Sequence, residues 1–247
     1  MRYKINTTSK TELLILNFIA KFGYVEEIHI ISFTNLNKIY CQKLLRKLVA
    51  MQLIIREKIL HNRDYYIYLS KYGAKILQIK LPSKPVLHTL LHDSMLVQLY
   101  LYLSKFNPNL IITVDKELKR HNNKILDSKF RLPDLLINNK IAIELELSQK
   151  NDVRLQEIVH NYIKDINYSL IIYIVKNLTI MNKIKTIINN ISDKFYFYLL
   201  DDNLDINNLK LCNDNSLEIL ELINNTPNIN IHEKFGNFTY IKFFSDN

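Results

Sequence analysis

Residues Arg131–Lys150 read RLPDLLINNKIAIELELSQK, and this stretch predicts the part of the fold around which the rest can be arranged. Its first half is apolar around a Pro-Asp step. In its second half, Ile141–Leu147, larger apolar side chains alternate with Ala142, Glu144 and Glu146. Alternation places successive side chains on opposite faces of a strand, and the intervening Asn138-Asn139 pair is typical of a tight turn. We therefore predict a hairpin with strands at 132–137 and 141–147.

The predicted hairpin brings three carboxylates close together. Asp134 lies on the first strand, and Glu144 and Glu146 share one face of the second. Carboxylates this close repel one another unless a cation, a basic side chain or water relieves them. The cluster is therefore either a metal site or a structural or partner-contacting site that Lys150 or Arg154 neutralises.

Length and charge limit the class of protein. The chain has 247 residues, of which 48% are apolar and 23% charged, as in an ordinary globular protein of one or two domains. Residues 1–85 hold 15 Lys and Arg but only 5 Asp and Glu, whereas the remainder holds 18 basic and 19 acidic residues. Positive charge concentrated in one third predicts a polyanionic partner for that third, with a solvated basic surface as the alternative.

The basic third has the element order of a winged helix-turn-helix. Ser9-Lys-Thr-Glu12 has the spacing of a helix-capping box, and apolar residues follow it at helical intervals. The expected elements are helices at 9–23, 26–33 and 37–52, strands at 53–60 and 65–69 around a polar turn, and a helix at 70–78. The apolar inner face expected for the third helix is Cys41, Leu44, Leu45, Leu48 and Val49.

In a winged helix the third helix enters the major groove of DNA and the hairpin contacts the backbone. Basic and amide side chains on these two elements suit contacts to phosphates and base edges. The residues predicted to bind double-stranded DNA are Lys38, Gln42, Lys43, Arg46 and Lys47 on the helix, and Lys58, His61 and Arg63 in the hairpin. The alternative is a protein–protein interaction module whose basic face meets an acidic protein.

A Pro-containing stretch at 81–87 predicts a linker between a DNA-binding domain at 1–80 and a second domain at 88–247. The second domain begins with a helix at 88–106. There His88 and His92 lie one turn apart with Asp93 adjacent, a spacing that can share a metal. No third ligand is evident nearby, so we expect a structural or domain-contact role.

The rest of the second domain alternates strands and helices, which predicts an α/β fold with a mixed sheet. A polar loop is expected at 115–128, between the first strand and the hairpin. The other expected elements are strands at 110–114, 170–175 and 195–200, helices at 152–167 and at 179–191 (capped by Thr179), a short helix near 217–223, and strands at 229–231 and 238–244.

This order of elements is that of the PD-(D/E)xK (restriction-endonuclease-like) core. Joined to a winged helix, and with Pro133-Asp134, Glu144-Leu145-Glu146 and a Ser148-x-Lys150-x-x-x-Arg154 tail, the chain over residues 10–200 resembles the replication-relaxation family and MobC-type plasmid mobilisation proteins. The resemblance implies a DNA-binding accessory or regulatory protein of plasmid or mobile-element replication or mobilisation. It implies no well-defined catalytic activity and no cofactor.

The alternative within the same resemblance is a Mg²⁺- or Mn²⁺-dependent DNA endonuclease. Asp134 and Glu144 would hold the metal, and the candidate catalytic residues are Asp134, Glu144, Glu146 and Lys150. However, Glu146 occupies the position where such a nuclease has its lysine, which puts a negative charge where the transition state accumulates one. Lys150 or Lys140 would have to replace that lysine. We therefore expect a nuclease-like domain that serves dimerisation or partner contact.

The two cysteines, Cys41 and Cys212, are far apart and form no metal spacing, which favours a reducing compartment. The start of the chain has no apolar stretch typical of a secretory signal, and no apolar run is long enough to span a bilayer. We expect a cytoplasmic protein without a membrane partner. A second copy of the chain and relaxase or replication proteins are candidate partners.

Overall fold

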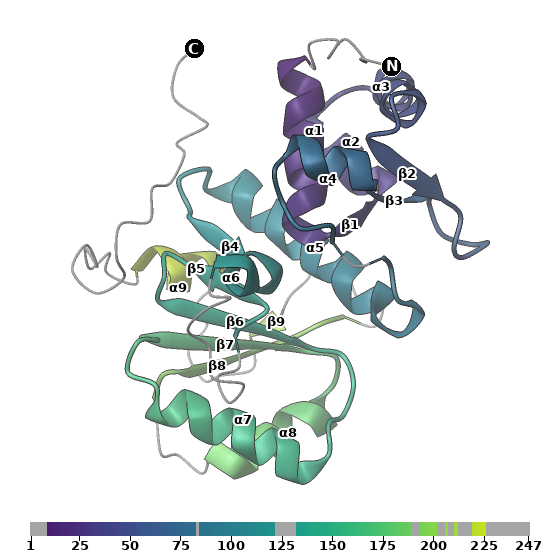
Figure 1. Cartoon of the computed structure of the whole chain (residues 1–247). Helices are drawn as coiled ribbons and strands as arrows, with labels where there is room; N and C mark the ends of the chain where they lie inside the picture. Colours follow the sequence, from purple (N-terminus) through teal and green to yellow (C-terminus); the bar gives the residue numbers. More distant parts are fainter. Residues whose placement is uncertain are drawn as a thin grey trace.

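The computed structural model describes residues 9–82, 84–121, 132–188, 193–201, 206, 210–211 and 219–225. It contains a three-stranded and a six-stranded sheet with helices packed around them, which confirms the predicted α/β class with a mixed sheet (Figure 1). In this part of the chain, no helix has the length and apolar character needed to cross a membrane.

The basic third forms a helical cluster with a small antiparallel sheet of order β1-β3-β2. Side chains of Ser9, Asn37 and Ser70 accept backbone hydrogen bonds at the starts of three helices, as the sequence predicts for Ser9 and Ser70. The elements are α1 (Lys10–Phe22), β1 (Tyr24–Glu26), α2 (Glu27–Thr34), α3 (Lys38–Ala50), β2 (Ile54–Glu57), β3 (Tyr66–Leu69) and α4 (Lys71–Ile76).

Two features of this part differ from expectation. The strand β1 was not predicted, because its three residues are all buried and show no alternation; it forms by pairing with the distant β3. On α3, Cys41, Leu44, Leu45 and Leu48 are buried as predicted, whereas Val49 is 39% exposed. Val49 lies in the last turn of α3, beyond the apolar core.

The second part is built on the six-stranded sheet, of order β4-β5-β6-β7-β8-β9. The pairs β4-β5, β5-β6 and β8-β9 are antiparallel, and β6-β7 and β7-β8 are parallel. Its elements are η1 (Leu87–Thr89), α5 (Leu90–Phe106), β4 (Ile112–Val114), α6 (Asp115–His121), β5 (Leu135–Ile137), β6 (Ile141–Glu146), α7 (Asp152–Lys164), β7 (Leu170–Val175), α8 (Leu178–Ile188), β8 (Phe195–Leu199), β9 (Lys210–Leu211) and α9 (Ile219–Asn225).

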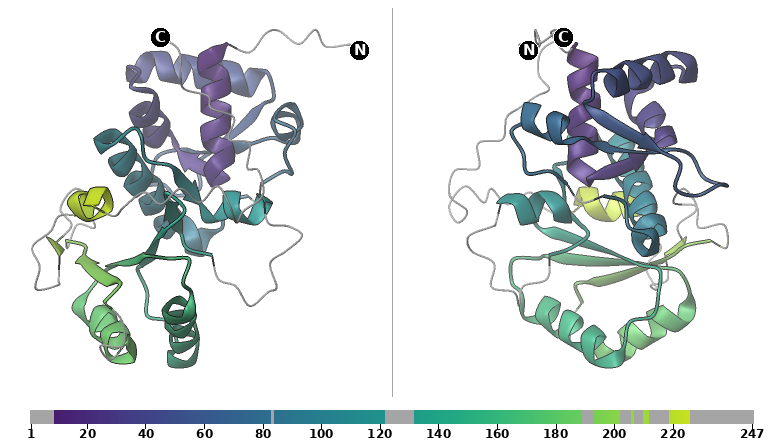
Figure 2. Two further views of the ribbon diagram at one scale, coloured as in Figure 1. Left: turned by 90° about the vertical axis from the view of Figure 1, so that its left-hand side faces the viewer. Right: turned by 45° about the vertical axis from the view of Figure 1, so that its right-hand side comes forward.

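The six-stranded sheet separates two apolar cores. On one face, Ile143 and Ile172 pack with α5 in a cluster that continues into the cores of α1 and α3. On the other face, Ala142 and Tyr173 pack with α7 and α8. Figures 1 and 2 show α7 and α8 beneath the sheet, with α5 between the sheet and the N-terminal helices. The predicted boundary at 81–87 stays a prediction, and one apolar cluster extends across it.

The predicted hairpin is confirmed. Asn138 and Asn139 have φ of 49° and 59°, and the Lys140 N–H donates to the Ile137 carbonyl at 3.0 Å, which is the geometry of a type I′ turn. The turn sets a register in which Leu135 lies opposite Ile143. The first strand is shorter than predicted, because the chain bends at Asp134.

Two other predictions are corrected by the structure, and others fall on residues that it does not describe. The predicted polar loop after Val114 begins with α6, whose start is held by the Asp115 N–H donating to the Asp134 carbonyl at 3.2 Å. The predicted cap Thr179 is wrong, because the side chain of Asn177 accepts from the Ile180 N–H at 3.0 Å. The predicted strands 229–231 and 238–244 lie outside the described residues, as does Cys212.

Gly73 allows α4 to pack directly on the backbone between α3 and β2. A Cβ atom at this position would lie 2.0 Å from the Leu53 carbonyl oxygen, which already accepts from the Ser70 N–H. The Leu53 carbonyl is held by this hydrogen bond, so moving it away from an added Cβ atom would cost free energy.

We predict that Gly73→Ala lowers the free energy of unfolding by about 2–3 kcal/mol, as overpacking does. In an unconstrained helix the same change is stabilising by about 1 kcal/mol, so the sign of the effect is diagnostic. Urea denaturation followed by circular dichroism measures it. Lys75→Ala, an exposed change on the same helix, is the control and should shift stability by less than about 0.5 kcal/mol. A stabilised Gly73→Ala variant would show that α4 does not approach Leu53 closely.

Candidate functional site

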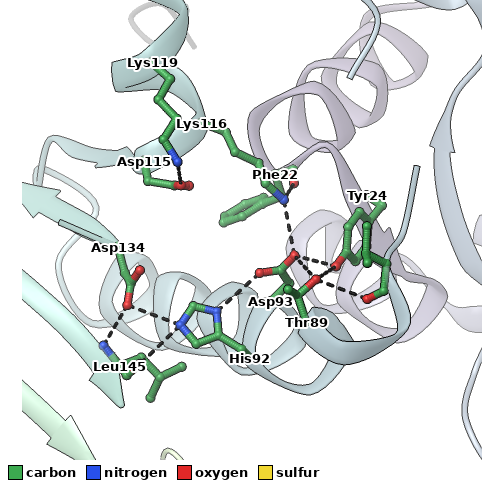
Figure 3. A network of polar contacts seen from close by, with 11 residues as sticks. Phe22, Tyr24, Thr89, His92, Asp93, Asp115, Lys116, Lys119, Asp134 and Leu145 are labelled. Carbon is green, nitrogen blue, oxygen red and sulfur yellow. Dashed lines mark hydrogen bonds and ion pairs between the residues drawn. The ribbon is translucent and has the colours of Figure 1, made fainter. Parts of the chain in front are cut away.

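A polar network centred on His92 joins the N-terminal part to the six-stranded sheet (Figure 3). His92 lies in the first turn of α5. Its Nδ1 is 3.3 Å from Asp93 Oδ1, and its Nε2 is 3.2 Å from both Asp134 Oδ2 and the Leu145 carbonyl oxygen. The imidazole therefore spans the distance from α5 to the ends of β5 and β6.

The surroundings of His92 favour its charged form. Burial by itself lowers the pKa of an imidazole, but hydrogen bonds to Asp134 and Asp93, together with their negative charges, raise the pKa of His92 to about 10. At neutral pH the ring is an imidazolium that donates from both nitrogens. Its side chain is 31% exposed, so solvent weakens these interactions without removing them.

Asp93 connects this ring to the N-terminal part. Its Oδ2 accepts from the Tyr24 hydroxyl of β1 and lies 3.3 Å from Lys116 Nζ of α6. Burial raises the pKa of Asp93, but bonding to His92, the charge of Lys116 and the Tyr24 hydrogen bond together lower it to about 2. Lys116 also donates to the Phe22 carbonyl at the end of α1, at 2.7 Å. These contacts of His92 fit the predicted structural or domain-contact role, which stays a prediction, whereas His88 is exposed.

The structure gives the predicted catalytic carboxylates different partners. Asp134 Oδ2 accepts from the Leu145 N–H at 2.9 Å and contacts His92 on the α5 side of the sheet. Glu144 is 1% exposed and accepts a hydrogen bond from the Tyr162 hydroxyl of α7, on the other side. Asp134 lies at a bend just before β5 rather than in the paired strand, and these two carboxylates contact opposite layers of helices.

The third carboxylate, Glu146, forms an ion pair with Lys150. This pairing matches the predicted neutralisation of the cluster by Lys150, whereas Arg154 is exposed on α7. Within the described residues, no group of three or more His, Cys, Asp or Glu side chains is arranged to hold a metal ion. Metal binding by Asp134 and Glu144 stays a prediction.

The second candidate site is the basic surface of α3. Lys38, Lys43 and Arg46 are exposed, and α3 carries no acidic residue. Two further predicted DNA-binding residues of α3 also bond within the protein, although the Lys47 side chain stays 54% exposed. The amide of Gln42 donates to Glu27 Oε1 at 2.7 Å, and Lys47 Nζ lies 2.6 Å from Glu12 Oε1.

The hairpin between β2 and β3 carries the remaining predicted DNA-binding residues. His61 and Arg63 are exposed, and Lys58 donates from Nζ to the Arg63 carbonyl, which bends the loop back on itself. At its base, the Arg56 guanidinium lies 3.7 Å from the centre of the Tyr65 ring and 2.7 Å from Glu27 Oε2. The hairpin projects from the body of the protein (Figure 1).

Sequence reasoning missed Tyr24, Thr89 and Lys116 in the His92 network. Tyr24 meets Asp93 across 69 positions of sequence, and Lys116 meets it across 23. Thr89 lies one turn before Asp93, at 3.4 Å, and this spacing is the one local signal that could have found it. Comparisons of the chain with models of protein families, with curated proteins and with solved structures find no match.

We predict that His92→Gln lowers the free energy of unfolding by about 2 kcal/mol near neutral pH, because it removes the cation between two carboxylates. A pKa raised in the folded state gives stability that is complete below pH 6.5 and is lost as pH rises toward about 10. The stability difference between wild type and variant should therefore shrink across this range. Urea denaturation at several pH values measures it.

The control for this experiment is His88→Gln, which removes an exposed imidazole one turn earlier. It should leave stability and its pH dependence unchanged. A difference between wild type and His92→Gln that stays constant from pH 6.5 to about 10 would contradict a charged His92.

We also predict that Tyr162→Phe destabilises the protein by about 2 kcal/mol, because it removes a hydrogen-bond donor from the buried Glu144 carboxylate. Burial, together with the charge and hydrogen bond of Glu144, raises the pKa of Tyr162 well above its usual value. Thermal and urea denaturation measure the change. Tyr168→Phe removes a phenol from the same side of the sheet and should cost less; an unchanged stability in Tyr162→Phe would mean that the Tyr162–Glu144 bond contributes nothing.

Proposed function

We propose that this protein binds double-stranded DNA through α3 and the β2–β3 hairpin. The observation that carries the proposal is the exposed face of α3, where Lys38, Lys43 and Arg46 lie in solvent on a helix without acidic residues. Phosphates are the dominant source of affinity in DNA binding, and exposed Lys and Arg are the side chains that meet them.

The order of elements supports a winged helix as the framework. Helices α1, α2 and α3 precede the β2–β3 hairpin, and β1 completes the small sheet. In that framework α3 enters the major groove, and Lys58, His61 and Arg63 of the hairpin contact the backbone alongside it. Gln42 and Lys47 then support α3 from within through Glu27 and Glu12.

The second half supports a PD-(D/E)xK-like assignment through its topology. Along the chain, helix α5 is followed by β4, helix α6, β5, β6, helix α7 and β7, and the strands β4, β5, β6 and β7 are neighbours in that order in the sheet. Its carboxylates have partners that fit architecture better than catalysis: His92 for Asp134, Tyr162 for Glu144 and Lys150 for Glu146.

In this proposal the nuclease-like half provides dimerisation or partner contact, and the whole chain acts as an accessory or regulatory protein. The resemblance to the replication-relaxation and MobC-type proteins suggests a setting in plasmid or mobile-element replication or mobilisation. DNA binding by the N-terminal part does not depend on that setting and can be tested alone.

We predict that Lys43→Ala combined with Arg46→Ala weakens DNA binding and lowers the magnitude of the salt slope by about 2, because each lost phosphate contact removes about one released counterion. Fluorescence anisotropy with a labelled duplex at several salt concentrations measures the slope of log affinity against log salt. The full-length chain is used throughout.

The matched control removes two positive charges elsewhere. Lys164, the last residue of α7, and Lys176, directly after β7, are both exposed and lie away from α3. Lys164→Ala combined with Lys176→Ala has the same net charge as the test variant and should keep the wild-type slope. If both double variants behave alike, the binding surface is not α3; if the wild type binds no duplex at low salt, the proposed function is wrong.

A further inference from the structure

The exposed face of α3 is not only basic. Ile39, in its first turn, is 72% exposed, and among the large apolar side chains of the described residues only Ile166 is more exposed. Tyr40 beside it is 48% exposed. These two side chains, with Asn37, Lys38 and Lys43, line a shallow hollow on the surface of α3.

Helical spacing places Ile39 on the face that the proposed function uses. Ile39, Lys43 and Arg46 are separated by four and three positions, so they follow one another along one side of α3. The buried positions Cys41 and Leu45 lie on the other side of the helix. An apolar side chain therefore stands in line with the two basic residues and points away from the core.

The charges around Ile39 and Tyr40 indicate the composition of a partner that would cover these two side chains. Lys38 and Lys43 flank the apolar pair, and α3 has no acidic residue, so an apolar partner that arrives with negative charge on either side fits best. The major groove of DNA has this composition, because phosphates border it and the 5-methyl group of thymine is an apolar feature on its floor.

We propose that Ile39 and Tyr40 read thymine by packing against its 5-methyl group in the major groove. This inference rests on the proposed DNA binding and adds to it a base preference for A·T pairs. The basic residues supply affinity that does not depend on sequence, whereas the apolar pair supplies discrimination between base pairs. The first turn of a groove-bound helix is the part closest to base edges.

The test uses two short duplexes that differ only in the methyl group. One is A·T-rich. The other is the same duplex with every thymidine replaced by deoxyuridine, which removes the 5-methyl group and keeps all charges and base pairs. The full-length wild-type protein should bind the thymine duplex more tightly, by about fourfold for one buried methyl group and about fifteenfold for two. Competition fluorescence anisotropy at fixed salt measures the ratio.

Variants then assign the preference to residues. Ile39→Ala combined with Tyr40→Ala should bind both duplexes equally while keeping the wild-type salt slope, since no charge is changed. Val49→Ala removes a 39% exposed apolar side chain from the other end of α3 and should keep the preference. Circular dichroism of each variant checks that α3 is intact.

The outcomes separate the two proposals. Salt-dependent binding with equal affinity for both duplexes, or a preference that survives in the Ile39→Ala, Tyr40→Ala variant, would overturn the thymine inference and leave DNA binding in place. Absence of binding to either duplex at low salt would overturn both. A change of oligomeric state in that double variant, without any methyl preference in the wild type, would make this face a contact between copies and overturn the inference.

Discussion

The contacts of His92 with Asp93 and Asp134 connect α5 to the six-stranded sheet, and Asp93 continues this network to Tyr24 of β1. Without the imidazolium, two carboxylates would share a partly buried space and repel each other. Lys116 adds a second cation, 3.3 Å from Asp93, and through the Phe22 carbonyl it ties the same network to α1. A parallel link runs from Lys21 of α1 to the Ile112 carbonyl of β4, at 2.7 Å. Polar groups thus fix the orientation of parts that a shared apolar core holds together.

The same principle explains how the sheet tolerates three nearby carboxylates. Directing Asp134 toward α5 and Glu144 toward α7 gives each its own hydrogen-bond donor and puts the sheet between their partners. Glu146 is neutralised locally by Lys150. A carboxylate removed from water needs an ion-pair or hydrogen-bond partner, and each of these three has one. An acidic sequence pattern can therefore reflect the architecture of a sheet as well as catalysis.

Buried glutamates also shape the basic surface. Glu27 holds Gln42 of α3 and Arg56 of β2, and Glu12 holds Lys47, so α3 and the hairpin are fixed from the inside. On α3, Lys38, Lys43 and Arg46 are exposed. Internal hydrogen bonds and ion pairs hold part of this surface in place, which would lower the entropy lost in the proposed DNA binding.

Local patterns in the sequence predicted several features that arise from neighbouring residues, although the cap at Thr179 was wrong. Asn138 and Asn139 tolerate positive φ and so specify the hairpin turn, alternation assigns the two faces of β6, and Ser9 and Ser70 cap the helices that follow them. Only the tertiary structure decided that β1 forms, that Asp134 meets His92 and that Lys47 pairs with Glu12. These outcomes depend on groups distant in sequence, whose approach is set by how the helices pack on the sheet.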